Sequence, residues 1–380
     1  MTDELFERVR RRLASSDTPA DPVSVARAVR AEAGGALGQD AVLGAVRLAR
    51  EEFVGAGPLA PLLGKPGVTD VFVTAPDKVL VDTGTGPQET KVRFADEEAV
   101  RRLAQRLALA GGRRLDDAQP FADCWLPGVG PQGRVRMHAV LPPIAPAGTI
   151  LSFRVLRPAT HDLAELRLRG VFGTSGAELL DAVIRHRLAF LVSGGTGAGK
   201  TTLLSALLGA VPPGERIVCV EDAGELQPDH PRFVSLLTRP ANVEGAGEIG
   251  LGELVRQALR MRPDRLVVGE ARGGEVIALL NAMNTGHEGG GCTLHANSAA
   301  EVPARMEALA SLGGLKRDAL HSQLTAAVRV VLHMRRLPNG IRRLDEVGVL
   351  RSFRGEAKVV PVWSKGDWIG DETSFEEMAA

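Results

Sequence analysis

Hydrophobic and polar positions follow different periods in successive parts of the chain. Up to about residue 55, apolar positions such as Val42, Leu43, Val46, Phe53 and Val54 recur with helical spacing, and Asp21-Pro22 has the form of a helix start. From residue 57 to residue 157, short β-rich runs surround one amphipathic pattern at 97–110, which predicts a helix. The predicted strands are 70–74, 79–82, 136–141 and 149–156.

The remainder of the chain reads as strand followed by helix, repeatedly, to about residue 310. Such alternation is typical of a mainly parallel sheet in an α/β protein. Strand-like runs return at 328–333, 345–350 and 358–362. We therefore expect an N-terminal helical segment (1–55), a small α+β domain (56–158) and an α/β domain with a C-terminal extension (159–380), a division that suits a chain of 380 residues.

Charge and composition exclude several classes of protein. The chain has 46 basic and 46 acidic residues, and this neutral balance argues against a protein whose main task is to coat nucleic acid. Aromatic residues make up only 4% of the chain, so we do not expect it to bind nucleic acid mainly by stacking aromatic side chains on bases. Three widely spaced cysteines offer neither a disulfide framework nor a thiolate zinc site. The N-terminus lacks the apolar run of a secretion signal, and no stretch approaches about 20 apolar residues. We expect a soluble protein that reaches a membrane only through a partner.

A glycine-rich loop follows the apolar run 188–192 and precedes a helical pattern at 202–210. Its sequence matches G-x-x-x-x-G-K-[ST], in which backbone N–H groups and a helix N-terminus bind phosphate. Lys200 would reach the β- and γ-phosphates, and the Thr201 hydroxyl would bind Mg²⁺. Lys200 is one of only seven lysines among the 46 basic residues. The predicted ATP-binding residues are Gly194, Gly195, Thr196, Gly197, Ala198, Gly199, Lys200, Thr201 and Thr202.

Acidic residues follow two of the predicted strands. Glu221 and Asp222 come after the run 216–220, and Glu270 comes after the run 265–268. In a parallel sheet, ligands bind beyond the carboxyl ends of the strands, so these acids are expected beside the glycine loop. The run 265–268 ends without the Asp that nucleotide hydrolases normally have at the Walker B position. Glu270 therefore either binds the water shell of the metal or acts as the base for the attacking water. We favour the base.

A third strand-like run ends at His295. A lone histidine more often makes a structural hydrogen bond than takes part in catalysis, so its residue type alone leaves the role of His295 open. His287 has neither metal-ligand spacing nor a carboxylate pattern around it, and we interpret it as structural.

Together these segments resemble the type II/type IV secretion ATPase superfamily, and within it the TadA/CpaF-like pilus-assembly branch. The resemblance covers roughly residues 55–335. The four-cysteine zinc insertion of many type II secretion and pilus extension motors is absent, which favours the Tad-like branch. Besides the glycine loop, the matching segments are the Asp box (221–226), the Walker B region (259–273) and the His box (281–289 and 293–298).

The resemblance implies a RecA-like P-loop ATPase domain that hydrolyses Mg-ATP. It implies that Glu270 serves the attacking water, that Glu221 binds the water shell of Mg²⁺, and that His295 senses the γ-phosphate. It also implies a cytoplasmic homo-oligomer, a hexamer, that works at an inner-membrane platform protein in pilus assembly or secretion.

The N-terminal half resembles the family as well, at 112–116, 136–143 and 152–154. In relatives, arginines of this region close over the nucleotide, which makes Arg136 and Arg154 candidate ligands, although surface ion pairs are an equal alternative. Trp125 stands where the family pattern has Arg, and Val155 replaces a basic residue.

Formal charge is distributed unevenly along the neutral chain. Residues 101–200 carry 14 basic and 7 acidic side chains, whereas residues 201–300 carry 8 and 12. We expect these two charged faces to meet around Mg-ATP, within one subunit or between subunits. Two other functions stay open: a nucleic-acid motor for conjugation, and a nucleotide-binding scaffold without hydrolysis.

Overall fold

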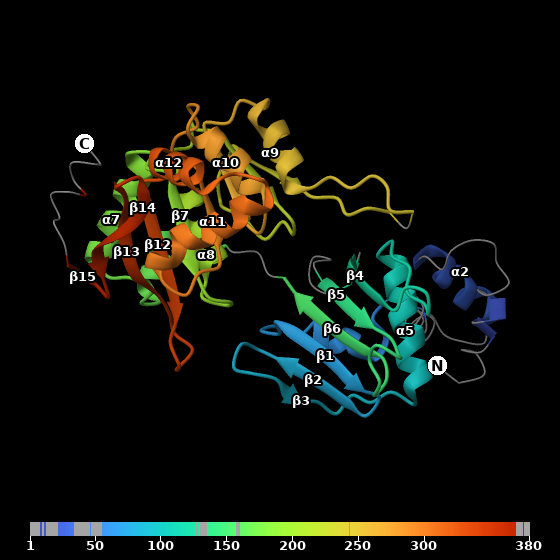
Figure 1. The fold of residues 1–380 in the computed structure, drawn as a ribbon. Coiled ribbons are helices and arrows are strands. Elements are labelled where there is room, and N and C mark those ends of the chain that lie inside the picture. Colours follow the sequence, from blue (N-terminus) through green and yellow to red (C-terminus); the bar gives the residue numbers. More distant parts are fainter. Residues whose placement is uncertain are drawn as a thin grey trace. The chain divides into compact units, whose positions relative to one another are not determined.

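The computed structural model of the protein describes residues 8–9, 11–12, 22–33, 46, 55–126, 128–129, 135–156, 160–242, 244–369 and 375. The chain divides into two compact units, Met1–Arg157 and Pro158–Ala380, and each is described by itself (Figure 1). In the N-terminal segment, helix α2 (Pro22–Ala33) begins at the proline that the sequence indicated. Of the apolar positions predicted to be helical before residue 55, Val42, Leu43, Phe53 and Val54 lie outside the described residues.

The first unit contains an antiparallel sheet with the strand order β3-β2-β1-β6-β5-β4. Helix α5 (Glu97–Ala110) covers one face, and its first turn is capped by Asp96, whose carboxylate accepts a hydrogen bond from Ala99 N at 2.7 Å. The strands are β1 (Asp70–Ala75), β2 (Lys78–Asp82), β3 (Gln88–Glu89), β4 (Phe121–Leu126), β5 (Val135–Val140) and β6 (Ile150–Val155), and η1 (Gly57–Leu59) and α4 (Ala60–Leu63) precede them.

Alternation along these strands separates a buried face from an open one. Met137 and Phe153 face the core with Leu103 and Leu107 of α5, whereas Arg136, one position from Met137, lies on the other face. Within its described residues, the unit is therefore a two-layer α+β structure whose second sheet face carries exposed or half-buried side chains.

The second unit is built on a larger sheet with the order β15-β14-β13-β12-β7-β11-β10-β8-β9. The strands from β12 to β9 are parallel, and β13, β14 and β15 add an antiparallel edge. The strands are β7 (Phe190–Gly194), β8 (Ile217–Glu221), β9 (Phe233–Leu237), β10 (Arg265–Glu270), β11 (Gly291–Leu294), β12 (Val330–Arg336), β13 (Arg342–Phe353), β14 (Glu356–Ser364) and β15 (Asp367–Trp368).

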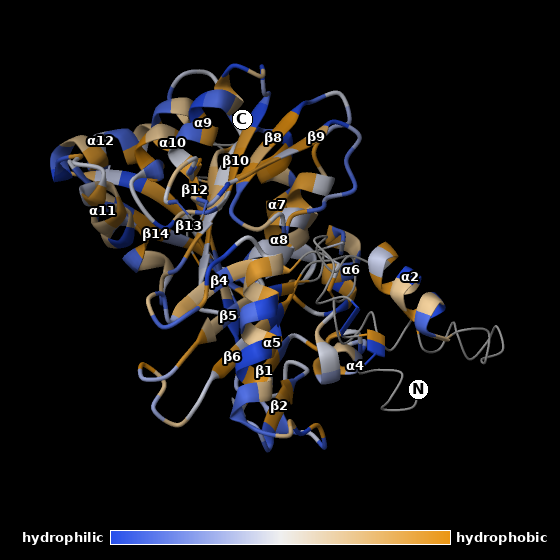
Figure 2. Ribbon diagram, turned by 90° about the vertical axis from the view of Figure 1, so that its right-hand side faces the viewer, coloured by the Kyte–Doolittle hydropathy of each residue, from blue (hydrophilic) through white to orange (hydrophobic). Residues whose placement is uncertain are grey.

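Helices cover both faces of this sheet, so its central strands are buried on both sides. Along β7, Phe190 and Val192 contact one core while Leu191 contacts the other. This explains why the strand sequences read as continuous apolar runs, as the orange ribbon of β8 also shows (Figure 2). The first core includes α6 (Leu163–Leu168), α7 (Thr174–Arg185) and α8 (Lys200–Gly209), and the second includes α9 (Leu251–Leu259), α10 (Glu275–Met283), η3 (Ala299–Glu301), α11 (Val302–Leu312) and α12 (Arg317–Ala327).

The predicted fold class is confirmed: the unit is a parallel-rich α/β domain, and helix α5 has the predicted bounds. Four of the described strands were not predicted: β3, β4, β9 and β15. All four lie at sheet edges. The side chains of β3, β9 and β15 are exposed or half-buried, so these strands have a weak apolar pattern, whereas β4 buries three of its six side chains. Among the described helices, none combines the length and apolar character that crossing a membrane requires.

Candidate functional site

The glycine loop joins the end of β7 to the start of α8, as the sequence predicted. Gly194, Gly197 and Gly199 have φ angles of 151°, 69° and 94°, which side chains with a Cβ rarely adopt. A Cβ on Gly194 would also lie 2.3 Å from the carbonyl oxygen of Met334 on the adjacent strand. Lys200 is the first residue of α8, and its Nζ donates to the carbonyls of Gly194 and Gly195 at 3.1 and 3.0 Å. Its ammonium is therefore held at the helix N-terminus, where anions bind.

Glu270 ends β10 at an irregularity in the sheet. Val268 pairs with Cys292 and Glu270 with Thr293 of β11, so Gly269 is an extra residue in the ladder. Such a bulge re-aims the side chain that follows it. The Thr293 hydroxyl donates to the Gly269 carbonyl at 2.7 Å, which fixes the bulge. A Cβ on Gly269 would lie 2.7 Å from Cγ of Glu221, so glycine is also required for the two acids to approach.

Glu221 ends β8 and is buried, with 3% of its surface exposed. One carboxylate oxygen accepts hydrogen bonds from the backbone N–H groups of Glu225 and Leu226 at 3.1 and 3.0 Å. Burial raises the pKa of Glu221 to about 7, because water no longer solvates the charged form, and these two hydrogen bonds offset only part of that effect. The second oxygen lies 3.5 Å from the Ser235 hydroxyl.

His295, just after β11, links Lys200 to Glu270. Its Nε2 lies 2.7 Å from Oε1 of Glu270, and its Nδ1 lies 3.5 Å from Nζ of Lys200. Burial, and then the charge of Lys200, lower the pKa of His295. A neutral ring with its proton on Nε2 satisfies both contacts, donating to Glu270 and accepting from Lys200. Burial likewise lowers the pKa of Lys200, against the opposing effect of Glu270.

The residue chemistry around the loop fits a magnesium nucleotide. A cavity of about 40 Å³ at the strand ends is lined by Thr201, Glu221 and Glu270. Among the described residues there is no group of three or more His, Cys, Asp or Glu side chains that could hold a metal alone. Mg²⁺ is often held in this way, by one or two protein oxygens together with the substrate phosphates.

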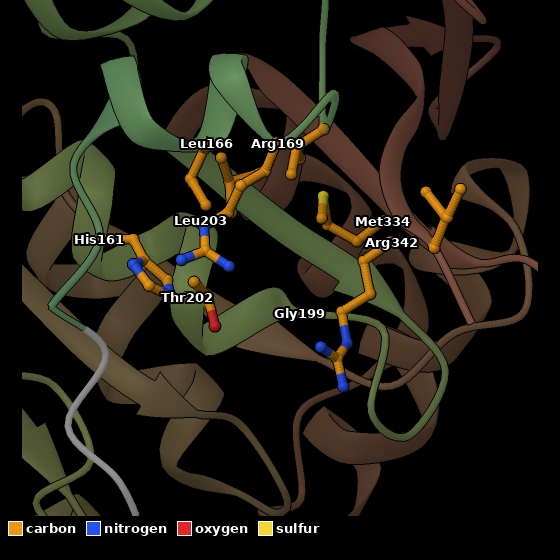
Figure 3. Close-up of a pocket in the computed structure, with 10 residues that line it drawn as sticks. His161, Leu166, Arg169, Gly199, Thr202, Leu203, Met334 and Arg342 are labelled. Atoms are coloured by element: carbon orange, nitrogen blue, oxygen red, sulfur yellow. The ribbon is translucent and has the colours of Figure 1, made fainter. Parts of the chain in front are cut away.

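A larger pocket of about 400 Å³ lies on the other side of the loop, beside the first turns of α8 (Figure 3). Leu166, Leu203 and Met334 supply apolar walls, and Arg169 and His161 supply polar groups. Because the pocket adjoins both Gly199 and Thr202, a molecule bound there could continue onto the phosphate loop.

Sequence reasoning missed several residues that contact the loop or the acids. Arg342 of β13 donates from Nε to the carbonyl of Gly197 at 2.8 Å, although 145 positions separate the two residues. Arg272 pairs with Glu270 and lies 3.6 Å from Asp222. For Arg272 a signal was available, because it lies two residues after Glu270 inside the segment 259–273 that resembles the Walker B region.

Arg136 and Arg154, predicted from the N-terminal half, lie opposite each other on β5 and β6 of the first unit. Arg136 makes two hydrogen bonds to Asp123, at 2.8 and 2.5 Å, and lies 6.0 Å from the centre of the Trp125 ring. Arg154 contacts Asp70 at 3.3 Å. Both arginines are thus ion-paired within their own sheet, and their contact with a nucleotide stays a prediction.

Comparisons with known proteins agree with this fold. A protein of Mycobacterium tuberculosis named for conjugal transfer is 61% identical over 339 residues, which cover 89% of this chain and 96% of that protein. The type IV secretion system protein VirB11 of Bartonella quintana is 27% identical and covers 74% of this chain and 88% of its own length. The crystal structure of the pilus retraction motor PilT with bound ADP has the same fold, with 22% identity, a TM-score of 0.53 and coverage of 76% of this chain and 79% of that one.

The family described as "Type II/IV secretion system protein" matches residues 52–352, a span that includes the first sheet, the parallel strands of the second sheet and every residue of the candidate site. The predicted resemblance to this superfamily is therefore confirmed, and the chain belongs to the type II/IV secretion system protein family.

Proposed function

We propose that the protein is an ATPase that hydrolyses Mg-ATP and converts the hydrolysis into mechanical work. The observation that carries this proposal is the continuous contact from Lys200 through His295 to Glu270. It joins a phosphate-binding ammonium to a carboxylate that can accept a proton, within one edge of a parallel sheet.

Each residue has a separate part in the proposed reaction. The loop N–H groups and Lys200 bind the phosphates, and Glu270 orients the attacking water and takes its proton. His295, already in contact with both Lys200 and Glu270, would sense the γ-phosphate. Thr201 and Glu221 would hold Mg²⁺, Glu221 through water, and the ion would neutralise charge on the phosphates.

The pocket beside α8 is the proposed site of the nucleotide base and sugar. Its apolar walls suit a flat ring, and it adjoins the loop that would hold the phosphates (Figure 3). Gly199 and Thr202 line it from the loop and from the first turn of α8.

We further propose that the protein works as a hexamer at an inner-membrane platform protein, from the cytoplasmic side, in Tad/Flp-type pilus assembly or protein secretion. Family membership supports a role in secretion. We retain the three-part division at residues 55 and 158, with Arg136 and Arg154 closing over the nucleotide in one subunit or from its neighbour. Loss of the γ-phosphate contacts on hydrolysis would then release this closure.

The name of the M. tuberculosis relative favours a second candidate, a motor for conjugal transfer. Such a motor that acted directly on DNA would bind it tightly and in a salt-sensitive way, and DNA would stimulate its hydrolysis. Phosphate release measured with and without single- and double-stranded DNA distinguishes the two. Stimulation that disappears at high salt would support the DNA motor, and its absence would support pilus assembly or secretion.

The proposal is tested by the substitution Lys200→Ala. We expect phosphate release to fall by at least about 100-fold and the affinity for a fluorescent ATP analogue to fall by at least about tenfold, because the ammonium stabilises phosphate charge in both states. Lys316→Ala, at an exposed lysine far along the chain, is the matched control and should leave both values unchanged. Hydrolysis at the wild-type rate in Lys200→Ala would contradict the proposal.

A further inference from the structure

Arg272, in the loop after β10, contacts acids at the ends of two neighbouring strands. Its Nε donates to Oε2 of Glu270 at 2.7 Å, and its Nη2 donates to the same oxygen. Its Nη1 lies 3.6 Å from Oδ2 of Asp222, which follows β8. The guanidinium therefore bridges the carboxylate proposed as the base and a second carboxylate that is not proposed to react.

The two oxygens of the Glu270 carboxylate have different partners. Oε2 is held by the guanidinium, whereas Oε1 points to Nε2 of His295 at 2.7 Å, on the side of Lys200. A fork of two N–H donors on one oxygen restricts rotation of the carboxylate more than a single donor does. Arg272 and His295 thus contact different oxygens of Glu270.

Further hydrogen bonds hold the backbone at Arg272 and the side chain of Asp222. The Glu275 carboxylate accepts hydrogen bonds from the backbone N–H groups of Arg272 and Gly273, at 2.5 and 2.8 Å, which ties the loop to the first turn of α10. The hydroxyl of Thr238 donates to Oδ1 of Asp222 at 3.1 Å. The backbone of Arg272 and the side chain of Asp222 are therefore both anchored, although 55% of the Arg272 side chain is exposed to solvent.

We propose that Arg272 is a positioning residue for hydrolysis: anchored by Asp222, its guanidinium holds Oε2 of Glu270 so that Oε1 faces the reacting phosphate. This inference rests on the proposed ATPase function. It assigns Arg272 no contact with the nucleotide, and its removal should slow the chemical step without weakening nucleotide binding.

The experiment compares turnover and binding in Arg272→Ala, Arg272→Lys and the control Arg256→Ala, which breaks a similarly exposed ion pair with Glu253 on α9. We expect Arg272→Ala to lower kcat by roughly 10- to 100-fold, as misplacement of a catalytic group does, and to change the Kd of a fluorescent ATP analogue by less than about threefold. Arg272→Lys should be intermediate, because an ammonium lacks the fork. Methylguanidinium should restore part of the turnover of Arg272→Ala.

A double-variant cycle makes the test specific to Glu270. Because Arg272 acts through that carboxylate, Arg272→Ala combined with Glu270→Gln should be no slower than Glu270→Gln alone, and methylguanidinium should not restore it. Three outcomes would overturn the inference while leaving the ATPase proposal intact. These are a wild-type kcat in Arg272→Ala, a loss of nucleotide affinity in Arg272→Ala as large as its loss of kcat, and additive losses of kcat in the double variant. Absence of hydrolysis in the wild-type protein would overturn both.

Discussion

The two sheets of the protein place their charged side chains in opposite ways. On the antiparallel sheet of the first unit, Arg136 of β5 and Arg154 of β6 lie on the open face, each paired with an acid of a neighbouring strand. In the second unit, Glu221 and Glu270 come from the ends of two parallel strands and Lys200 from the start of α8, and all three converge at one edge of the sheet, half-buried or buried.

The difference follows from strand direction. Parallel strands all end at the same edge, so residues distant in sequence meet there without special loops. Antiparallel neighbours end at opposite edges, so their end residues do not gather at one place. Charged side chains on the open face of the first sheet instead form ion pairs with side chains of the adjacent strand. Charge at the converging edge should therefore carry function at a cost in stability, whereas charge on the open face should contribute little to stability.

The largest expected effect comes from the converging edge, in Glu270→Gln. The amide keeps the size of the side chain but cannot take a proton, so kcat should fall by about 10²- to 10⁴-fold while nucleotide affinity stays nearly constant. Phosphate release and binding of a fluorescent ATP analogue measure the two quantities. Glu253→Gln, in the exposed pair on α9, should change neither. Unchanged kcat in Glu270→Gln would place the base elsewhere.

A smaller effect is expected on stability in Glu221→Gln. The pKa of Glu221 is about 7 in the folded protein against 4.5 ordinarily, so the folded state binds the proton more tightly and its stability falls as pH rises between these values. Glu221→Gln avoids this cost. It should raise the free energy of unfolding of the nucleotide-free protein by about 3 kcal/mol at pH 8 and by less than about 1 kcal/mol at pH 5.

Urea unfolding at the two pH values checks this prediction, with Glu98→Gln, an exposed glutamate of α5, as the control. If Glu221→Gln raised the free energy of unfolding equally at pH 5 and pH 8, the destabilisation by Glu221 would not come from burying its charged form.

The smallest effect is expected on the open face, in Arg136→Ala. About 40% of both the Arg136 and Asp123 side chains is exposed, so water already solvates the pair. The free energy of unfolding should fall by less than about 1 kcal/mol, as is usual for surface ion pairs. Urea unfolding of Arg136→Ala, Asp123→Asn and the double variant measures the pair. A loss above about 3 kcal/mol would remove the distinction between the two sheets.

Residues close in sequence could be placed from the sequence alone, whereas contacts between distant segments could not. The glycine loop was predictable because its function requires one local spacing between strand and helix, and Glu221 and Glu270 were predicted because each comes at the end of a buried strand. His295 also follows a buried strand, but its role was predicted only from the resemblance of 281–289 and 293–298 to the His box of the family. The bulge at Gly269 depends on pairing with β11, which no local pattern specifies. The bond from Arg342 to Gly197 likewise depends on where β13 lies.

The position of β7 in its sheet has a consequence for how the protein is made. The strand that leads into the phosphate loop pairs with β11 on one side and with β12 on the other, and β12 begins only at Val330. During synthesis, β7 therefore keeps an unpaired edge until the last part of the chain has left the ribosome, and an exposed edge of apolar strand invites pairing with other chains. Pairing with β12 removes this edge, so the nascent chain is most open to such pairing before Val330–Arg336 has emerged.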